Sequence, residues 1–334
     1  MHPPSVSLVI PVRNEAQHIR LTLDSILRQT YPLSDVEILV VDGMSTDGTQ
    51  EVVREYASRL PQLWVLDNEG VITAAALNIG IRAARGEYIA IIGGHSEPSP
   101  NYLAACLDKL SQPGFGCVGG VLDTVSTTAV GKAIALAMSS PFGVGNAYYR
   151  YSRREMDVDT VAFGVYRKAI FDELGAFNEE ITFSEDEELS FRITQSGHRI
   201  RLLPQVSVRY YARETYRELW HQYYNYGRGK VKVFKKHRRF LSWRSLVPPV
   251  FVLSQLLGIL GGLFYRPVLA LWVAVVVVYL TIGIFVALTI TRWNVFETVA
   301  VFWAYVCLHI SYGVGVLAGL AEWLFTILFP GKLE

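Results

Sequence analysis

The sequence contains little cysteine, and one long stretch of it has no acidic residue. Its 334 residues include three cysteines, Cys106, Cys117 and Cys307, which lie far apart and form no CxxC pair. This argues against a disulfide framework and against a cysteine zinc site. No aspartate or glutamate occurs between Glu218 and Glu297. The formal net charge is +1, so nothing in the overall charge indicates a nucleic-acid partner.

The stretch without acidic residues is mostly apolar. Hydrophobic residues make up 51% of the chain, and after about Trp243 they are nearly continuous. Segments 246–264, 267–290 and 295–320 each supply the roughly 20 residues needed to cross a hydrocarbon core of ~30 Å. We therefore expect about three transmembrane helices in a membrane domain of residues 245–330. Three core helices of a soluble domain are the alternative, but little other sequence remains to cover them.

The third apolar segment differs from the other two. It continues to Phe329, which is too long for one simple span. It also contains a carboxylate and three glycines, namely Glu322, Gly313, Gly315 and Gly319. These residues indicate a tilt, a kink or a tail that lies on the membrane surface.

A basic and aromatic segment precedes the apolar ones. Residues 214–239 show a helical pattern that is aromatic at first and basic afterwards. The cations in and after it are Arg228, Lys230, Lys232, Lys235, Lys236, Arg238, Arg239 and Arg244. Aromatic and cationic residues on one helix suit a membrane interface. We predict an amphipathic interfacial segment at 214–244, in which residues 230–239 bind anionic lipid headgroups.

The same cations predict an orientation. Under the positive-inside rule, the basic segment lies on the cytoplasmic face of the membrane. We therefore expect a multi-pass protein of the plasma membrane, or of the inner membrane, with a cytoplasmic catalytic part. Three spans would leave the C-terminus on the far side.

The first part of the chain alternates short apolar runs with helical patterns. The apolar runs that we expect to form strands are 6–12, 36–41, 63–66 and 88–92. This alternation predicts an α/β fold in which a mainly parallel sheet carries helices on both faces. We assign it to a domain of residues 1–213. Polar residues follow the first, second and fourth runs, and ligands of such sheets bind beyond the carboxyl ends of the strands.

Four motifs occur in order along this domain. They are Ile10-Pro-Val-Arg-Asn-Glu15, Val40-Val-Asp-Gly-Met-Ser-Thr-Asp-Gly-Thr49, Ala76-Leu-Asn-Ile-Gly-Ile-Arg-Ala-Ala-Arg-Gly-Glu-Tyr88 and Phe183-Ser-Glu-Asp-Glu-Glu-Leu-Ser-Phe-Arg192. Over about residues 5–230 the chain resembles the family-2 inverting glycosyltransferases of the GT-A fold, which is a Rossmann-like, mixed but mainly parallel sheet. Residues 142–146, 158–167 and 226–229, with the C-terminal spans, resemble most the membrane-anchored glucosyltransferases of succinoglycan-type exopolysaccharide assembly.

The resemblance implies a nucleotide-sugar donor bound at the strand ends. Asp42 would accept a hydrogen bond from the nucleobase or ribose. The full set of expected donor-binding residues is Pro11, Arg13, Glu15, Asp42, Gly43, Ser45, Gly93 and Gly94. An alternative role for Glu15 is to favour the N-terminus of the helix that follows. Asp47 belongs to an Asp-Gly turn pair, so we expect it to cap that turn.

The acidic run 185–188 supplies the candidate base. By resemblance Asp186 removes the proton of the acceptor hydroxyl as that oxygen attacks the anomeric carbon, and displacement in one step inverts the configuration. Glu185 is the second candidate. The alternative is that the four acids only place negative charge at a helix N-terminus.

A departure from the family pattern concerns the metal. The family has Asp-x-Asp, or Asp-x-His in close relatives, where this chain has Gly93-Gly94-His95. His95 and Glu97 remain, and together they could hold Mn²⁺, which accepts imidazole, or Mg²⁺. Alternatively, arginines or lysines balance the diphosphate charge without a tightly held ion.

A second departure concerns Gln222-Tyr-Tyr-Asn-Tyr226. Processive members of the wider family carry Gln-x-x-Arg-Trp near the membrane, whereas this chain has Asn225 and Tyr226 at the last two positions. This argues against a polymer-extruding synthase. We expect Tyr226 and Arg228 to contact the acceptor or the diphosphate, although Arg228 also suits the membrane surface.

These expectations combine into one function with two alternatives. The chain would transfer a sugar, from a UDP-sugar by resemblance, to a lipid-linked saccharide at the cytoplasmic leaflet in cell-surface polysaccharide synthesis. The first alternative is a polyprenyl-phosphate glycosyltransferase, whose acceptor is the lipid phosphate and needs no strong base. The second is a non-catalytic sugar-nucleotide sensor or scaffold of a polysaccharide complex.

Overall fold

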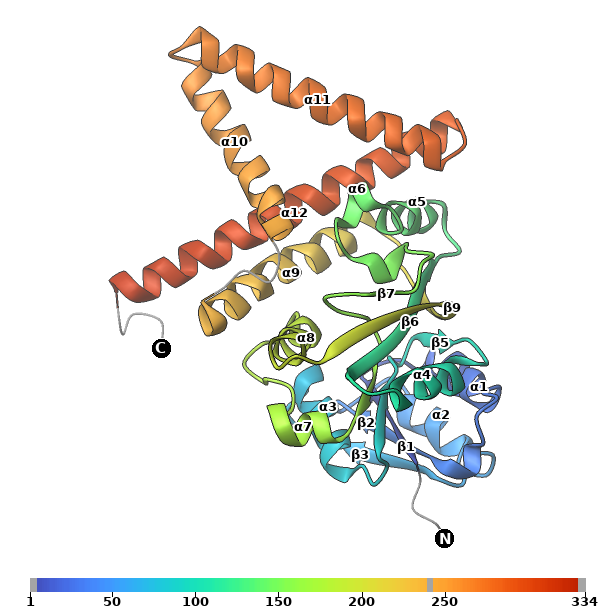
Figure 1. Ribbon diagram of the computed structural model, residues 1–334. Coiled ribbons are helices and arrows are strands. Elements are labelled where there is room, and N and C mark those ends of the chain that lie inside the picture. The colour runs from blue at the N-terminus through green and yellow to red at the C-terminus, as the bar shows by residue number, and fades with distance from the viewer. Residues whose placement is uncertain (1–4, 239–242, 330–334) are drawn as a thin grey trace. The chain divides into compact units, whose positions relative to one another are not determined.

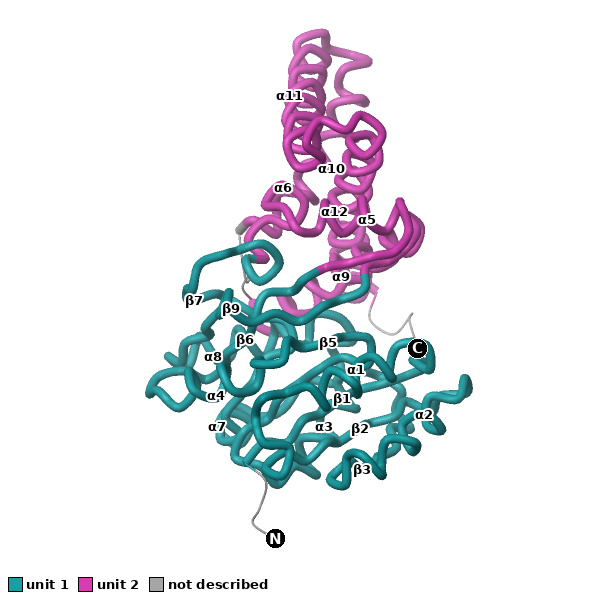
Figure 2. Tube along the Cα trace, turned by 90° about the vertical axis from the view of Figure 1, so that its right-hand side faces the viewer, with its two compact units in different colours: residues 1–123, 148–211 teal, residues 124–147, 212–334 magenta. Residues whose placement is uncertain are grey.

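The computed structural model describes residues 5–238 and 243–329. The chain divides into two compact units, the first formed by residues 1–123 and 148–211 and the second by residues 124–147 and 212–334 (Figure 2). The predicted domains 1–213, 214–244 and 245–330 differ from this partition, because residues 124–147 group with the later part of the chain. Arg239 of the basic segment and the last residue of the predicted membrane domain, Pro330, lie outside the described residues.

The first unit is built on a mixed sheet of nine described strands. Their order is β3-β2-β1-β4-β8-β6-β9-β5, and β7 pairs with β9 (Figure 1). The strands are β1 (Val6–Val12), β2 (Val36–Asp42), β3 (Leu63–Asp67), β4 (Tyr88–Ile91), β5 (Ser96–Pro98), β6 (Phe115–Val125), β7 (Met156–Asp157), β8 (Val165–Arg167) and β9 (Arg199–Tyr211). The first four are parallel, and β8 joins β4 antiparallel. The predicted α/β fold with a mixed sheet is confirmed, and its parallel pairs lie among β1 to β4, whereas the pairs of β5, β7, β8 and β9 are antiparallel.

Helices cover both faces of this sheet, as the alternation of strands and helices predicts. Residues of β1 point alternately to two separate apolar cores, so that Leu8 and Ile10 enter one core and Val9 enters the other. One face carries α1 (Ile19–Leu27), α2 (Thr49–Glu55) and α4 (Tyr102–Ser111), and the other carries α3 (Thr73–Ala83), α7 (Ala169–Leu174) and α8 (Glu185–Gln195). Three short 3-10 helices lie at Leu33–Asp35, Tyr148–Arg150 and Trp243–Leu246.

The second unit is helical in its described residues. It contains α5 (Ala129–Met138), α6 (Pro141–Val144), α9 (Tyr216–His237), α10 (Val247–Gly262), α11 (Arg266–Ile290) and α12 (Val295–Leu328). Thr215 and Glu218 form a reciprocal capping box that starts α9. Three helices, at Arg244–Gly262, Arg266–Ile290 and Val295–Leu328, are long and apolar enough to cross a membrane. An apolar core joins α5, α9, α11 and α12, which explains why residues 124–147 belong to this unit.

Glycines bring α9 and α12 into backbone contact. A Cβ placed on Gly315 would lie 2.1 Å from the carbonyl oxygen of Tyr224, and one on Gly227 would lie 2.3 Å from that of Tyr312. Neither oxygen belongs to a flexible side chain, so a larger residue at either position would force the helices apart.

We predict that Gly315→Ala destabilises the second unit by about 1–3 kcal/mol, the usual range for overpacking a close contact. The thermal unfolding midpoint of the detergent-solubilised chain should fall. Ala321→Leu is the matched control, because Ala321 is an exposed residue of the same helix. Equal midpoints for the two variants would contradict the backbone contact.

Candidate functional site

The loops that follow β1 and β2 are hydrogen-bonded to each other. The register pairs Val12 with Asp42, so both strands end at the same level. Asn14 N–H donates to Ser45 Oγ over 2.9 Å, and Asn14 Oδ1 accepts from Thr46 N–H over 2.9 Å. Asn14 and Met44 have the positive φ values of 55° and 59°, which non-glycine residues seldom adopt away from special sites. The two loops therefore form one rigid rim at the carboxyl end of the sheet.

Asp42 organises this rim from inside. It is 1% exposed. Its carboxylate accepts hydrogen bonds from Ser45 N–H at 3.0 Å, from Ser45 Oγ at 2.5 Å and from Gln50 Nε2 at 2.7 Å. Asp42 thus lies at the predicted strand end, but both of its carboxylate oxygens accept hydrogen bonds from other residues of the chain. Sequence reasoning missed Gln50, which follows the quoted motif directly.

The other expected donor-binding residues of these loops lie around Asp42. Gly43 N–H donates to the carbonyl of Val12 at 2.8 Å. Pro11 is the register partner of Val41, and the exposed side chain of Arg13 lies over Gly43, 3.3 Å from where a Cβ would be. Arg13 is therefore the cation that this rim presents to solvent.

Asp47 holds the second loop against the first. Its carboxylate accepts from Ala16 N–H at 3.0 Å and from both the N–H and the hydroxyl of Thr49. The Thr49 hydroxyl is the main cause of the lowered pKa of Asp47. The capping role expected from the Asp-Gly pair agrees with these bonds.

Asn68 is a polar residue at this edge that sequence reasoning missed. It follows β3, is 2% exposed, and its N–H donates to the carbonyl of Asp42 at 2.8 Å. Its Nδ2 donates to the carbonyl of Ile72 at 3.1 Å, whereas its Oδ1 has no hydrogen-bond partner among the described residues. Val71, three residues on, has a φ of 62°, which is strained for a β-branched side chain. A buried acceptor without a donor suits a ligand that brings an N–H.

The end of β4 has no room for the carboxylate of the family pattern. A Cβ placed on Gly93 would lie 2.9 Å from Cε1 of Phe163, and one on Gly94 would lie 2.7 Å from Cγ1 of Val12. The Tyr102 hydroxyl donates to the carbonyl of Phe163 at 2.6 Å, and this bond holds the backbone of Phe163 in place. The glycines are therefore required by close packing at this position.

The two candidate metal ligands have protein partners instead. His95 Nδ1 lies 2.8 Å from Glu15 Oε1. The side chain of Glu97, 11% exposed, accepts from the Tyr211 hydroxyl at 2.7 Å and pairs with two cations, Arg28 at 3.5 Å and Arg209 at 3.7 Å. Within the described part of the chain, no three His, Cys, Asp or Glu residues are grouped to hold an ion. The predicted His95–Glu97 pair does not fit a metal site, because the charge of Glu97 is already neutralised.

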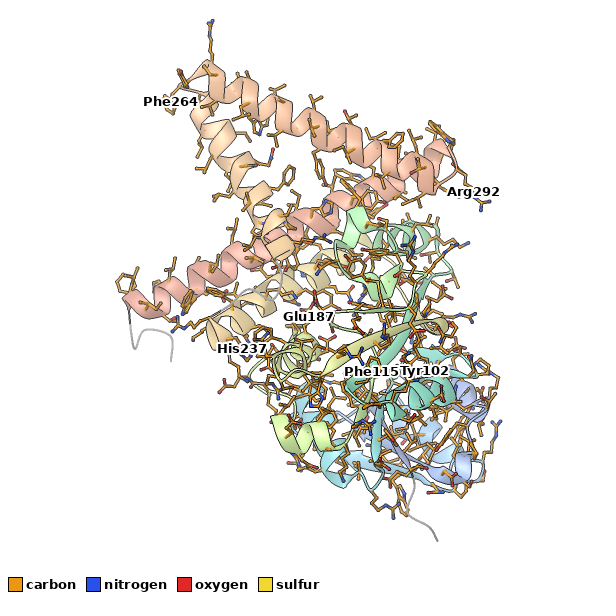
Figure 3. The ribbon with its side chains drawn as sticks, in the orientation of Figure 1. Tyr102, Phe115, Glu187, His237, Phe264 and Arg292 are labelled. Atoms are coloured by element: carbon orange, nitrogen blue, oxygen red, sulfur yellow. The ribbon has the colours of Figure 1, made fainter. Side chains whose placement is uncertain are left out.

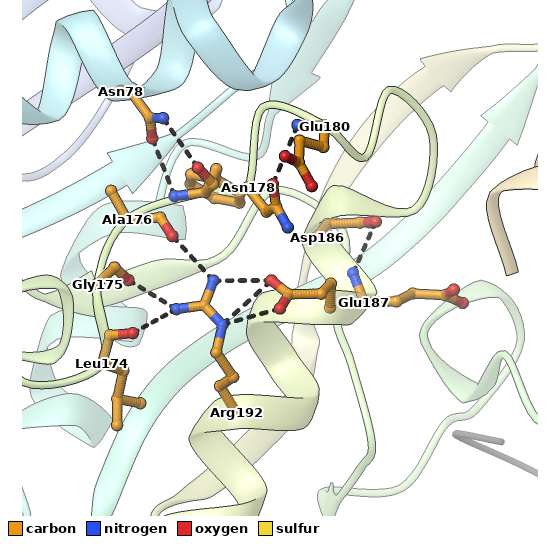
Figure 4. Close-up of polar contacts among 11 residues, drawn as sticks. Asn78, Leu174, Gly175, Ala176, Asn178, Glu180, Asp186, Glu187 and Arg192 are labelled. Carbon is orange, nitrogen blue, oxygen red and sulfur yellow. Dashed lines mark hydrogen bonds and ion pairs between the residues drawn. The ribbon is translucent and has the colours of Figure 1, made fainter. Parts of the chain in front are cut away.

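A buried ion pair fixes the start of α8. Glu188 is fully buried, and Arg192 binds it through Nε at 3.1 Å and Nη2 at 2.8 Å. The same guanidinium donates to the carbonyls of Leu174, Gly175 and Ala176 (Figure 4). Sequence reasoning grouped Glu188 with the other acids of the run and missed Arg192 as its partner.

Asn78 of α3 holds the same loop from the other side. Its Oδ1 accepts from Phe177 N–H at 2.9 Å, and its Nδ2 donates to the carbonyl of Phe177 at 2.9 Å and to Glu179 at 2.8 Å. Asn78 lies inside the third sequence motif, but the sequence does not reveal its hydrogen-bond partners. Asn78 and Arg192 together hold residues 174–179, which lead from α7 toward α8.

Two of the other three acids of the run, Glu185 and Asp186, are neighbours at the start of α8. Burial, and then the charge of Asp186, raise the pKa of Glu185 from 4.5 to about 8. Asp186 Oδ1 accepts from Glu187 N–H at 2.8 Å, and Ser184 before them has a φ of 68°. Glu185 therefore keeps its proton near neutral pH, when a general base must be ionised. The catalytic roles predicted for Asp186 and Glu185 stay predictions.

Tyr226 and Arg228, the expected acceptor or diphosphate contacts, belong to α9 in the second unit. The Tyr226 hydroxyl accepts from Gln222 Nε2 at 3.0 Å. Arg228 pairs with Glu322 of α12 at 2.8 Å, and both side chains are partly exposed. The role predicted for these two residues stays a prediction.

Comparison with known proteins decides the family. The family model described as Glycosyl transferase family 2 matches residues 7–175. The model described as Glycosyl transferase family group 2 matches residues 95–290. This chain belongs to glycosyl transferase family 2.

Two relatives cover most of the chain. It is 30% identical to the succinoglycan biosynthesis protein ExoA of Rhizobium meliloti (strain 1021), over 84% of this chain and 85% of that one. It is 27% identical to the dolichyl N-acetyl-alpha-D-glucosaminyl phosphate 3-beta-D-2,3-diacetamido-2,3-dideoxy-beta-D-glucuronosyltransferase of Methanococcus voltae, over 77% of this chain and 82% of that one. The predicted resemblance to family-2 glycosyltransferases is confirmed.

A solved structure shares the fold. The mannosyltransferase PcManGT of Pyrobaculum calidifontis, in complex with GDP-Man and Mn²⁺, has a TM-score of 0.62 and 21% identity, and the match covers 95% of this chain and 88% of that one. The expected GT-A fold is thus confirmed, and the chain is a glycosyltransferase with three helices apolar enough to span a membrane.

We predict that Arg192→Met lowers the free energy of unfolding by about 3–5 kcal/mol, because it leaves the Glu188 carboxylate buried without a partner. Chemical denaturation of the purified chain would measure this loss. Arg20→Met is the matched control, since Arg20 and its partner Glu55 are both exposed, and only a small change is expected there. Similar losses of unfolding free energy in both variants would show that the buried pair contributes no more to stability than the exposed pair.

Glu97→Gln should leave the dependence of activity on Mn²⁺ concentration equal to that of the parent chain. The amide can still accept from Tyr211 but loses its two arginine partners, so a modest fall in the unfolding midpoint is expected. Activity titrated with Mn²⁺, before and after chelation, provides the measurement. A higher Mn²⁺ requirement in the variant would identify Glu97 as a ligand after all.

Proposed function

We propose that this chain transfers a sugar from a nucleotide-sugar, by resemblance a UDP-sugar, to a hydroxyl of a lipid-linked saccharide with inversion of configuration. The observation that carries this proposal is the pair of neighbouring acids that opens α8. Burial and the charge of Asp186 raise the pKa of Glu185 to about 8, and Asp186 follows it in the first turn of the helix, where its Oδ1 accepts from Glu187 N–H. Carboxyl groups that interact in this way are typical of general acid–base sites.

The proposed reaction is a single displacement. Asp186 accepts the proton of the acceptor hydroxyl while that oxygen forms a bond to the anomeric carbon. The bond from the anomeric carbon to the diphosphate oxygen breaks in the same step, and the nucleoside diphosphate leaves with the electron pair. Attack from the face opposite the leaving group inverts the configuration.

The donor would lie on the rim formed by the loops after β1 and β2. Asp42 shapes this rim from below, so we assign it the positioning of Ser45 and Gly43 in the nucleoside pocket. Asn68 Oδ1 supplies an acceptor for an N–H of the base, and the exposed Arg13 supplies positive charge to the diphosphate. His95, held by Glu15 at 2.8 Å, would lie at the β4 end of the same rim.

The PcManGT complex contains Mn²⁺, but in this chain the residues at the matching motif do not form a ligand set, so we assign the cation no step. The Gly93 and Gly94 backbone would approach the donor closely in either case.

The acceptor and the location follow from the relatives and from composition. The Methanococcus voltae relative is named for a dolichyl-linked sugar phosphate, and three helices of this chain can cross a membrane. We propose a multi-pass protein with its catalytic part at the cytoplasmic leaflet, where the cations of α9 bind anionic headgroups. Tyr226 and Arg228 are proposed to face the acceptor or its diphosphate.

Asp186→Asn should lower kcat by about 10²–10⁴-fold, the usual contribution of a general base, and leave donor binding intact. Glu185→Gln, which imitates the protonated acid, should change kcat by less than about tenfold at pH 7. The pH profile of kcat should differ between the parent and Glu185→Gln around pH 8, where Glu185 ionises beside Asp186, because the glutamine has no charge to gain.

The assay is transfer of radiolabelled sugar into the lipid fraction of membranes that contain the chain, with a panel of nucleotide-sugars. Near-normal activity of Asp186→Asn would contradict the hydroxyl acceptor and support transfer to a lipid phosphate. Donor binding without incorporation by the parent, in the presence of acceptor lipids, would support the non-catalytic sensor.

A further inference from the structure

The helices α9 and α12 lie side by side over nearly the whole length of α9 (Figure 1). Near the start of α9, the Tyr216 hydroxyl donates to the carbonyl of Ala300 at 2.9 Å. Near its end, the rings of Phe234 and Trp323 lie 5.8 Å apart. Residues 300–323 of α12 therefore share their position along the pair with residues 216–234 of α9.

This pairing is a tight, fixed contact. Gly227 and Gly315 bring the two backbones together, as described above, and Gly319 packs on Val231, 3.0 Å from where its Cβ would be. Arg228 and Glu322 pair at 2.8 Å, and Arg238 lies over the Trp323 ring at 5.6 Å. With glycine contacts and polar contacts along its whole length, the pair must occupy one depth relative to a bilayer.

The charged residues of α9 indicate the depth at which the α9–α12 pair lies in the bilayer. Its 22 residues span about 33 Å, close to the ~30 Å of a hydrocarbon core. It carries six cations, namely Arg217, Arg228, Lys230, Lys232, Lys235 and Lys236. If residues 300–323 crossed the core, these cations would be distributed through it, which is strongly unfavourable.

We propose that α12 does not cross the membrane but lies with α9 along the interface, against lipid headgroups, so that only α10 and α11 span the bilayer. The proposal explains why α12, at 34 residues, is too long for a simple span. It also changes the predicted topology, because two spans return the end of α12 to the side from which α9 starts.

The arrangement of α10 and α11 agrees with two spans. Helix α10 meets α12 near its start, through Pro248 and Val252 against Gly313. Helix α11 meets α12 over its second half, where Gly283 lies against Phe302 and the Tyr279 hydroxyl lies 3.0 Å from His309 Nδ1. At their other ends they are joined by a short turn at Phe264, away from α12, and α10 runs crosswise to α12 (Figures 1 and 3). Such a hairpin can enter the core while α12 lies across its base.

Exposed side chains of α12 and the distribution of arginines agree as well. Phe296, Val299 and Trp303, at 91%, 61% and 58% exposure, lie at helical spacing on one face, as in a helix that inserts one face between lipids. The hairpin turn is followed by one cation, Arg266, whereas the base carries Arg244 and Arg292 beside the cations of α9. The positive-inside rule then places the base in the cytoplasm.

Single cysteines can test the topology in the full chain. Ser58→Cys marks the first unit, Tyr265→Cys the hairpin turn and Thr326→Cys the end of α12, and all three positions are exposed. The three native cysteines are buried, so the parent chain is the blank. Labelling with a membrane-impermeant maleimide is compared in intact and permeabilised cells.

We expect Thr326→Cys to label on the same side as Ser58→Cys and on the side opposite to Tyr265→Cys. Labelling of Thr326→Cys together with Tyr265→Cys on the other side would show that α12 crosses, and labelling of all three on one side would show that no hairpin spans; either result overturns the proposal. Neither readout needs enzymatic activity, so this test and that of the proposed function can fail separately.

A second measurement needs no substitution. Green fluorescent protein and alkaline phosphatase are fused in turn after Glu334 of the full chain in a Gram-negative host. A fluorescent fusion with inactive phosphatase is expected, since both report a cytoplasmic end. Active phosphatase with a dark fluorescent fusion would overturn the proposal even if a cysteine variant failed to insert.

Discussion

Parallel pairing of β1 with β2 and β4 is the constraint on which the first unit depends. Since the register sets Val12 level with Asp42, and Asp42 level with Asp67, three strand ends are level at one edge. Hydrogen bonds between the loops then fix the backbone there, including the left-handed residues Asn14 and Met44. Most carboxylates of these loops are used to hold the loops together, and the surface left for a ligand is made by backbone, by small residues and by a single exposed arginine.

The parallel half of this sheet could be predicted from the sequence, and the antiparallel half less well. Strands β1 to β4 are local apolar runs with polar ends, so their sequence pattern is sufficient to predict them. By contrast, β9 is one strand of 13 residues that continues through Pro204, although proline usually interrupts a strand pattern. Strand β8 has only three residues, Val165–Arg167, and pairs with β4 and β6. Such strands depend on partners distant in sequence, which local periodicity does not reveal.

For the site, the sequence predicted positions better than roles. It placed Asp42 and the acids of α8 correctly at the ends of elements, because those ends are local features. It could not show that Gln50 and Ser45 donate hydrogen bonds to the Asp42 carboxylate or that Arg209 pairs with Glu97. The partner of a carboxylate comes from elsewhere in the fold. Likewise, the run 185–188 reads as four equivalent acids, and only the folded structure shows that Arg192 pairs with the buried Glu188, whereas burial raises the pKa of Glu185.

The packing around Gly93 has a consequence for mutation. The space that a larger side chain would need there is taken by the partly buried ring of Phe163 and by the hydroxyl of Ser96. A change of Gly93 to aspartate would meet this filled space, whatever its chemical benefit. A carboxylate at this position would therefore need coordinated changes at its neighbours.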